Sequence, residues 1–338
     1  MNKDLKNLLQ LNTFIKMRFK NVLVLLFLSF SLVSIQPNHY NINCNFNEAY
    51  PISSQSYIIH PPILITSDSG FSGYSFMGNG SFNNPYLIEG YNITAVGSLS
   101  IAIEIRNTNS YFIIRDCIIY TEYIGIALSY VQSGTSKVSQ NIIISTTNNG
   151  GGILLGNMNN CTIERNYCHD FTQGIHTNDV DGCTIYSNNI LNSNYQGINI
   201  RYSDSNIITY NIIINSKQHG IAIVGTSMNN VIHHNRLENN AWADSYDIDG
   251  GPPQGRPTSQ AYDEGSNNIW YQSETQEGNF WSDYFGIGPY SIDGPVDSVD
   301  LYPFHTTGLT PFILIIIIIP SIGVILVVII VFLRRKRK

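Results

Sequence analysis

A glycine–isoleucine pair returns along the chain at nearly constant intervals, and this repeat constrains the fold more than any other feature. The pairs that begin at Gly152, Gly174, Gly197 and Gly220 follow one another at steps of 22, 23 and 23 residues, and an earlier pair begins at Gly125. A fixed period of this length is typical of a solenoid, in which each period forms one coil and packs on the next.

Two further residue types repeat in phase with the glycines. One is an isoleucine, and the other is an asparagine followed two residues later by an apolar side chain. The asparagine ladder consists of Asn166, Asn188, Asn211 and Asn235. Each period also holds three short runs of alternating apolar residues, which predict three strands with one buried face each. None of these runs has the 3.6-residue periodicity of a helix.

These patterns predict an all-β fold, a right-handed parallel β-helix with coils of about 22 residues. Ile175, Ile198 and Ile221 are expected to stack inside it, one coil above the next at about 4.8 Å. We expect the glycines to turn the chain and the asparagines to hold the corners through amide hydrogen bonds between coils. A leucine-rich repeat would need regularly placed leucines and a helical stretch, and the chain has neither.

The two ends of the chain carry membrane-related signals. Residues 1–35 contain a basic flank followed by a short apolar run, which predicts a signal peptide or an uncleaved signal anchor. Residues 312–333 are uncharged and long enough to cross a bilayer as a transmembrane helix. The basic residues 334–338 come directly after this span and are expected to stay on the cytoplasmic side.

The domain organisation follows from these ends. Residues 36–84 are expected to form a lead-in and cap, residues 85–304 the β-helix with its C-terminal cap, and residues 305–311 a linker. The lipid bilayer is then one partner of the chain, through a single C-terminal span. We expect a cell-membrane protein whose ectodomain lies outside and whose C-terminus is cytoplasmic.

Charge and cysteine content exclude other classes of protein. Ten of the 18 Lys and Arg residues lie in the first 20 and last five residues, so the segment between them is strongly acidic. Such a surface repels nucleic acid, and we exclude nucleic acid as a partner. The five cysteines are too few for a disulfide framework. Cys161 and Cys183 lie one coil apart at equivalent positions, where they either fill the core as thiols or form a bridge.

Two segments outside the repeat, together with the coils, carry a family resemblance. The predicted β-helix region opens with "NNPYLIEGYNIT" (Asn83–Thr94). It closes with "GNFWSDYFG" (Gly278–Gly286) and "PYSIDGPVDSVDLYPF" (Pro289–Phe304). With the coils, these segments resemble the parallel β-helix repeat (PbH1) proteins that include NosD-like periplasmic copper-binding proteins and carbohydrate-binding and sugar-hydrolase (CASH) domains. The resemblance implies an extracytoplasmic β-helix with carbohydrate or cell-surface roles. It fixes no activity, because different sites are built on one fold.

Carbohydrate-active members of this fold use carboxylates, a basic residue and often calcium, and one constellation in the repeat fits that description. The candidate catalytic residues are Asp179, Asp181, Arg201 and Asp204. Counted from their glycines, Asp181 and Asp204 occupy the same position on adjacent coils, where two carboxylates could share a calcium ion. The alternative is that these residues are solvated polar groups at a coil corner.

Other polar residues are candidates for ligand binding. The set is His176, Asn199, Tyr186 and Tyr202, with His176 and Asn199 on neighbouring coils. Aromatic faces stack on sugar rings, so the tyrosines suit glycan binding. His169, His233 and His234 could bind a metal, but they form no convincing ligand set for copper.

From these observations we expect a membrane-anchored extracellular glycan-binding or cell-envelope module. One alternative is a lyase, epimerase or hydrolase that acts on an acidic polysaccharide. A second alternative is a NosD-like copper-binding protein. No cofactor is certain, and calcium is the one that the sequence suggests.

Overall fold

The structure is a computed structural model that describes residues 56–244 and 255–304. The predicted leader (1–35), linker (305–311), membrane span (312–333) and basic tail (334–338) lie outside these residues, as does the first part of the predicted lead-in. No helix in the described part combines the length and the apolar composition that a membrane crossing requires.

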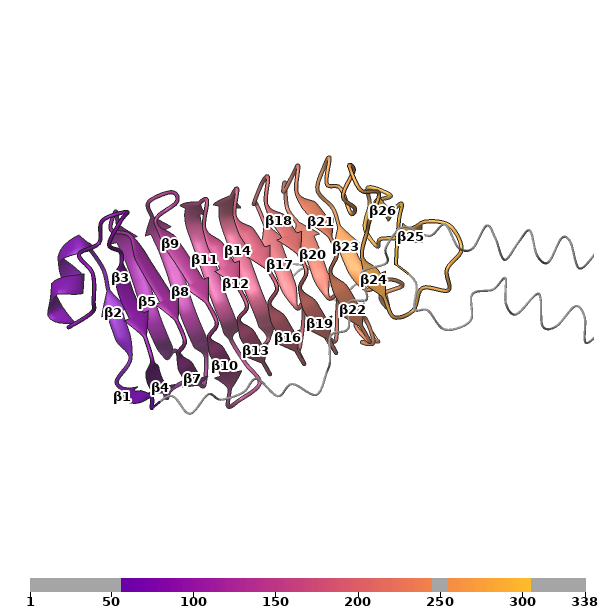
Figure 1. Cartoon of the computed structure of the whole chain (residues 1–338). Helices are drawn as coiled ribbons and strands as arrows, with labels where there is room; N and C mark the ends of the chain where they lie inside the picture. Colours follow the sequence, from indigo (N-terminus) through magenta and orange to yellow (C-terminus); the bar gives the residue numbers. More distant parts are fainter. Residues whose placement is uncertain (1–55, 245–254, 305–338) are drawn as a thin grey trace, which may run out of the picture. The chain divides into compact units, whose positions relative to one another are not determined.

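Three parallel sheets of nine, eight and seven strands form the framework of the described residues (Figure 1). Sheet A consists of β1 (Ile58–His60), β4 (Tyr91–Ala95), β7 (Ile118–Thr121), β10 (Ile142–Ser145), β13 (Tyr167–His169), β16 (Asn189–Leu191), β19 (Ile212–Ile214), β22 (Arg236–Glu238) and β24 (Phe280–Trp281). Sheet B consists of β2 (Ile63–Ile65), β5 (Ile101–Thr108), β8 (Ile124–Val131), β11 (Gly151–Asn159), β14 (Gln173–Asp181), β17 (Ile198–Arg201), β20 (Ile221–Val224) and β23 (Ala261–Asp263). Sheet C consists of β3 (Tyr86–Glu89), β6 (Phe112–Arg115), β9 (Ser136–Ser139), β12 (Thr162–Glu164), β15 (Thr184–Tyr186), β18 (Ile207–Thr209) and β21 (Val231–His233).

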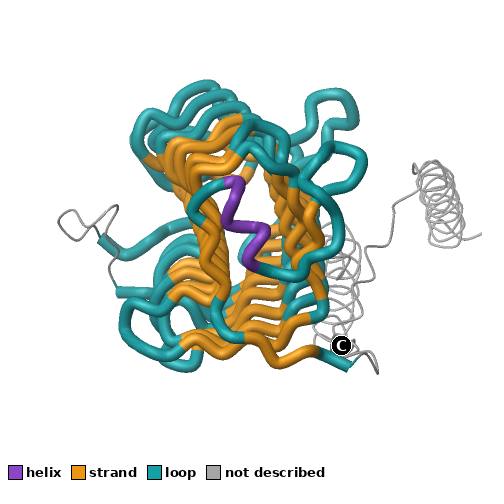
Figure 2. The backbone as a smooth tube through the Cα atoms, turned by 90° about the vertical axis from the view of Figure 1, so that its left-hand side faces the viewer, coloured by secondary structure: helices purple, strands orange, loops and turns teal. Residues whose placement is uncertain are grey.

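The chain visits the three sheets in turn, so each coil adds one strand to each sheet (Figure 2). This arrangement confirms the predicted parallel β-helix. Ile175 pairs with Ile198, and Ile198 pairs with Ile221, in the register expected from the repeat. All three side chains are fully buried, because alternation along each strand points every second residue into the solenoid.

The repeated glycines do not turn the chain, and that expectation was wrong. Gly174 and Gly197 are absent from the positions with positive φ. Glycine is needed there because the core approaches closely: a Cβ on Gly174 would lie 2.3 Å from Ile190 Cγ2 and 2.8 Å from the Gly197 carbonyl oxygen. Glycine therefore recurs because the coils pack tightly at this position, not because the backbone adopts a special conformation there.

The asparagines hold the corners through buried hydrogen bonds, but they do not adopt the left-handed conformation themselves. Asn188 Oδ1 accepts the main-chain N–H of Asn166 at 2.9 Å and its Nδ2–H at 3.0 Å. Asn188 Nδ2 in turn donates to Asn211 Oδ1 at 3.0 Å and to the Ile163 carbonyl at 2.9 Å. The same bonds extend the ladder from Asn141 through Asn166, Asn188, Asn211 and Asn235 to Asn279. The left-handed residues are those just before the asparagines, for example Ser187 with φ 56°.

The cysteines of the described residues fall into two groups. Cys161 and Cys183, on adjacent coils, form a disulfide with a Cα–Cα distance of 4.6 Å. Cys117 and Cys168 are buried thiols, and burial raises the pKa of each to about 12. These two thiols are therefore protonated and unreactive at neutral pH.

Both ends of the described solenoid core are covered. At the first end, the 3₁₀ helix η1 (Asp68–Gly73) lies across the opening between the sheets (Figure 2), and its Phe71 stacks on Tyr86 with ring centroids 4.4 Å apart. At the other end, the buried Trp281 stacks on Tyr290 of a short hairpin, β25 (Tyr290–Ser291) and β26 (Val299–Asp300). Covered ends are what an open stack of strands requires.

Candidate functional site

Three of the residues singled out in the sequence lie together on the outer face of sheet B. His176 in β14 pairs with Asn199 in β17, and Arg201 lies two residues further along β17. Burial, together with the smaller effect of the positive charge of Arg201, lowers the pKa of His176 from 6.5 to about 4. The His176 ring is therefore neutral at physiological pH, and its Nδ1 and the Asn199 Oδ1 are buried without a hydrogen-bond partner.

The carboxylates of the predicted catalytic group lie beside this face, at the end of β14 and after β17. Asp181 Oδ1 accepts the main-chain N–H of Asp204 at 2.8 Å, and Asp204 Oδ1 accepts that of Met228 at 2.8 Å. The two carboxylates thus stack on adjacent coils, and one oxygen of each links its coil to the next. Asp179 is exposed and has a φ of 60°. This geometry fits corner residues that support the backbone.

The structure does not place the candidate tyrosines on one face. Tyr202 follows β17, and the Arg201 guanidinium lies over its ring at 4.9 Å from the centroid. Tyr186 belongs to sheet C, where its ring meets the edge of Tyr210 at 5.6 Å. A continuous tyrosine platform next to His176 is therefore absent from the part of the chain that the structure describes.

The histidine pair that the sequence offered for metal binding lies at the end of sheet C. His233 Nδ1 lies 2.6 Å from His234 Nδ1, and His234 Nε2 lies 3.0 Å from Glu277 Oε2. Burial and the neighbouring His234 lower the pKa of His233 to about 4. Among residues 56–244 and 255–304, no group of three or more His, Cys, Asp or Glu side chains is arranged to hold a metal ion.

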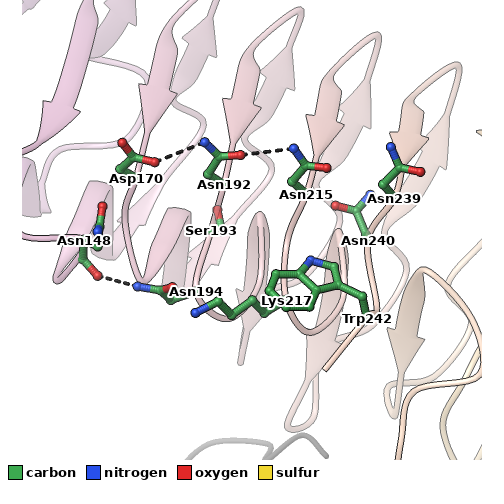
Figure 3. Close-up of a pocket in the computed structure, with 10 residues that line it drawn as sticks. All are labelled: Asn148, Asp170, Asn192, Ser193, Asn194, Asn215, Lys217, Asn239, Asn240 and Trp242. Carbon is green, nitrogen blue, oxygen red and sulfur yellow. Dashed lines mark hydrogen bonds between the residues drawn. The ribbon is translucent and has the colours of Figure 1, made fainter. Parts of the chain in front are cut away.

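A groove of about 620 Å³ runs along the corner at which the chain passes from sheet A to sheet B. We call it the corner groove, and Figure 3 shows its side chains in two rows along several coils. Its lining consists of Asn148, Asp170, Asn192, Ser193, Asn194, Asn215, Lys217, Asn239, Asn240 and Trp242. Six of these ten side chains are primary amides. The amide of Asn240 is buried and bonded to Ser216, Ile213 and Gln260, so the other five offer neutral donors and acceptors to the groove.

The first row of the corner groove, which we call the rung row, is Asp170, Asn192, Asn215 and Asn239. These residues follow β13, β16, β19 and β22, so successive members come from adjacent coils (Figure 3). Their φ angles lie between 52° and 65°, a conformation that Asn and Asp tolerate better than other side chains. The row is linked internally: Asn215 Nδ2 donates to Asn192 Oδ1, and Asn192 Nδ2 donates to Asp170 Oδ1, each at 3.2 Å.

The second row ends in the only tryptophan that is exposed in the described residues. Trp242 has 50% of its surface exposed, and the Lys217 ammonium lies 5.7 Å from the centroid of its ring. Further along the row, Asn194 Nδ2 donates to the Asn148 carbonyl at 2.5 Å. An aromatic ring, a cation and a line of amides thus meet in one groove.

Reasoning from the sequence missed the corner groove, although a signal was present. Asp170, Asn192, Asn215 and Asn239 recur at steps of 22, 23 and 24 residues, in the same period as the buried ladder. The predictions followed the strands of sheet B and the positions after them. Trp242 lies beyond the regular repeat, so no periodicity marked it.

The family described as "Right handed beta helix region" matches residues 102–269. No curated protein matches the sequence. Solved structures that resemble the chain include the DFA-IIIase of Arthrobacter chlorophenolicus A6 in complex with GF2, at 16% sequence identity and a TM-score of 0.41. That match covers 54% of this chain and 47% of the other, so this chain spans about half the length of that enzyme.

Two further solved structures show a more distant likeness to the chain. XylC in complex with xylose is 12% identical, with a TM-score of 0.35, and the match covers 55% of this chain and 42% of the other. The A-module of a mannuronan C-5 epimerase from Azotobacter vinelandii is 11% identical, with a TM-score of 0.30, over 66% and 78% of the two chains. At these identities the likeness concerns the fold alone.

Proposed function

We propose that this chain, which belongs to the right-handed β-helix family through residues 102–269, binds a glycan in its corner groove. The observation that carries this proposal is the composition of that groove: five primary amides that are not buried, beside one exposed tryptophan. Its volume of about 620 Å³ is within the range of small-ligand sites. The solenoid thus acts as a rigid support that presents the groove.

The amides suit hydroxyl groups because each can donate and accept at the same time. A sugar ring carries several hydroxyl groups that do the same, so a line of amides can bind them without leaving a charge unpaired. The exposed amides also lose little hydration when a sugar replaces water, because the hydrogen bonds are exchanged rather than lost.

Trp242 supplies the apolar half of the interaction. The faces of a pyranose carry C–H groups, and an aromatic ring buries them in a way that aliphatic residues cannot match in area. Lys217 lies over the indole ring, which restricts the tryptophan and keeps a cation at the edge of the groove. Half of the Trp242 surface is exposed, so part of the indole is open to a ligand.

The enzyme alternative has less support in the geometry. The carboxylates of Asp181 and Asp204 each accept a main-chain N–H of the next coil through one oxygen, so both are engaged in supporting the corner. His176 is neutral, but within residues 56–244 and 255–304 no hydrogen bond to a carboxylate orients its ring. A proton-transfer step on an acidic polysaccharide would need a base that is both ionised correctly and held in place.

The proposal includes a location. The basic flank of residues 1–35, the apolar residues 312–333 and the basic residues 334–338 support a solenoid outside the cell membrane and a cytoplasmic C-terminus. Digestion of intact cells with an external protease tests this: the solenoid should be cut while an epitope placed after Lys338 is retained. Protection of the solenoid would contradict the location.

The binding proposal is tested on an array of neutral and acidic polysaccharides, with the purified full-length protein and a Trp242→Ala variant. We expect the wild-type protein to retain at least one polysaccharide and the variant to lose at least about tenfold in affinity. Phe285→Ala is a matched control, because Phe285 is 90% exposed and lies outside the groove. Retention that is equal in all three proteins would contradict the site, and no retention by any would contradict the function.

A further inference from the structure

The spacing of the rung row indicates the direction and the repeat of the ligand, which the composition of the groove does not. Main-chain hydrogen bonds between coils fix the row: Asp170 N–H donates to the Leu191 carbonyl at 3.1 Å, and Asn192 N–H donates to the Ile214 carbonyl at 2.9 Å. Asn215 N–H continues the series to the Glu238 carbonyl at 3.0 Å. The four rungs therefore repeat at the strand spacing of about 4.8 Å.

This repeat is parallel to the solenoid axis. Adjacent rungs come from strands that are neighbours in sheet A, so the row crosses β13, β16, β19 and β22 in order (Figure 3). A ligand that follows the row must itself be extended and must present similar groups at similar intervals. In an extended polysaccharide, each sugar ring advances the chain by a distance close to this coil spacing.

The charges in the groove narrow the ligand further. Of the ten lining residues, only Asp170 and Lys217 are charged, and they carry opposite charges on different coils. A polymer of uronic acids would place a carboxylate at every rung. The lining provides one cation, Lys217, so most of these carboxylates would lie in the groove without an opposite charge. One of those carboxylates would also face Asp170, whose own carboxylate already holds Asn192 and lies 2.7 Å from His169 Nδ1.

We propose that the ligand is an unbranched, neutral polysaccharide that lies along the solenoid axis, with successive sugar rings on successive rungs of the row. This inference rests on the proposed glycan-binding function and adds the direction, the length and the charge of the ligand. The ring on the last of these coils contacts both Asn239 and Trp242, which lie on that coil, and the rings before it reach back along Asn215 and Asn192 toward Asp170.

The test is a length series measured by titration calorimetry with the full-length protein. The ligands are the oligosaccharides, from the disaccharide to the octasaccharide, of the neutral polysaccharide that the array retains best. We expect the affinity to rise about fivefold with each added sugar, which corresponds to about 1 kcal/mol per rung. The rise should stop once the chain is long enough to cover the four rungs and Trp242.

A rung variant locates the ligand on the row. Asn239→Gly removes the amide at the end of the row and keeps the left-handed backbone, which glycine adopts freely. In this variant the series should reach its plateau about one sugar earlier. Asn229→Gly is the matched control, since Asn229 is exposed, has a φ of 59° and lies outside the groove, and it should leave the series unchanged.

The outcomes separate the inference from the function on which it rests. Affinity that does not change with length would overturn the inference while leaving glycan binding in place. Tighter binding of uronic acid oligosaccharides than of neutral ones of equal length would overturn the neutral charge of the ligand. Failure to bind any polysaccharide on the array would overturn the proposed function itself.

Discussion

The coils and the C-terminal end of the solenoid meet the same hydrogen-bonding requirement with different side chains. Within the coils, Asn188 accepts two N–H groups from the coil before it and donates to Asn211 in the coil after it. At the end of the same ladder, Asp300 accepts the main-chain and side-chain N–H groups of Asn279 at 2.6 and 3.3 Å. A carboxylate, which only accepts, takes the place of an amide, which accepts and donates.

Two more amide ladders, Asn206–Asn230–Asn268 and Asn240–Gln260, end in the same way. In each, the last side-chain amide donates to an aspartate near the C-terminal end of the solenoid. The pairs are Asn268 with Asp263 at 2.9 Å, and Gln260 with Asp283 at 2.6 Å. The indole N–H groups of the cap add to this pattern, because Trp270 donates to Asp263 and Trp281 donates to Asp300.

The difference teaches that each ladder has a direction. Every amide points its oxygen toward the preceding coil and its nitrogen toward the following one, so the C-terminal end presents N–H groups that need an acceptor. A further asparagine would only pass the unmet donors on, and each buried donor without a partner costs about 1–3 kcal/mol. Exchanging the two side chains between the regions tests this directly.

Asn188→Asp should produce the largest effect. The new carboxylate would face the oxygen of Asn211 and the Ile163 carbonyl, where the native Nδ2–H groups donate. We expect a loss of about 3–5 kcal/mol in the free energy of unfolding, because a buried charge is left without a partner. Denaturant titration measures it, and Asn189→Asp, on the partly exposed neighbour, is the control. A variant within about 1 kcal/mol of the wild type would contradict the ladder.

Asp300→Asn should come next, with a loss of about 2–3 kcal/mol, although asparagine fills the same space. Its NH₂ group would oppose either the donors of Asn279 and Trp281 or the main-chain N–H of Tyr302. Asp297→Asn, at an exposed position of the same hairpin segment, should change little. If the Asp300 variant were as stable as its control, the ladder would not need an acceptor at its end.

The same contrast explains what the sequence could predict. The coils repeat, so periodicity was sufficient to identify the strands, the stacked isoleucines and the buried asparagines. Asp300 and Asp263 are not part of the repeat. No pattern in the sequence therefore identifies them as acceptors for ladders that begin many residues earlier.

The functional residues show the same limit. His176 and Asn199 lie side by side on adjacent strands, as the repeat predicts, because register follows from the repeat. Their surroundings could not be predicted, since burial and hydrogen bonding depend on all neighbouring coils. The corner groove was missed because Trp242 enters from a loop outside the repeat, and its contact with Lys217 is a tertiary one.

Acid should weaken the coils through His176. Its pKa is lowered to about 4, mainly by burial, from an ordinary value of 6.5. Between these two pH values the histidine is protonated in the unfolded chain but neutral in the folded chain. Stability should therefore fall as the pH drops from about 6.5 to 4, by about 2–3 kcal/mol from this residue. His176→Gln should flatten the profile of unfolding free energy against pH in that window. A profile as steep as that of the wild type would assign the acid sensitivity to other groups.

The smallest effect is expected for Asp181→Asn and Asp204→Asn. An amide oxygen can accept the same main-chain N–H as the carboxylate, so we expect a change below about 1 kcal/mol. Thermal unfolding with calcium and with a chelator then tests the predicted calcium site. A calcium-dependent rise in Tm that either variant removes would show that these carboxylates share an ion as well as supporting the corner.

The most direct test of the proposed function uses the tryptophans themselves. The chain has three, of which Trp270 and Trp281 are buried and Trp242 is half exposed, so quenching of fluorescence by acrylamide reports mainly on Trp242. Titration with the polysaccharide that the protein retains should protect this fraction from the quencher, and Trp242→Ala should abolish the effect. Retention of the polysaccharide with unchanged quenching would show that the glycan binds elsewhere and would contradict the corner groove as the site.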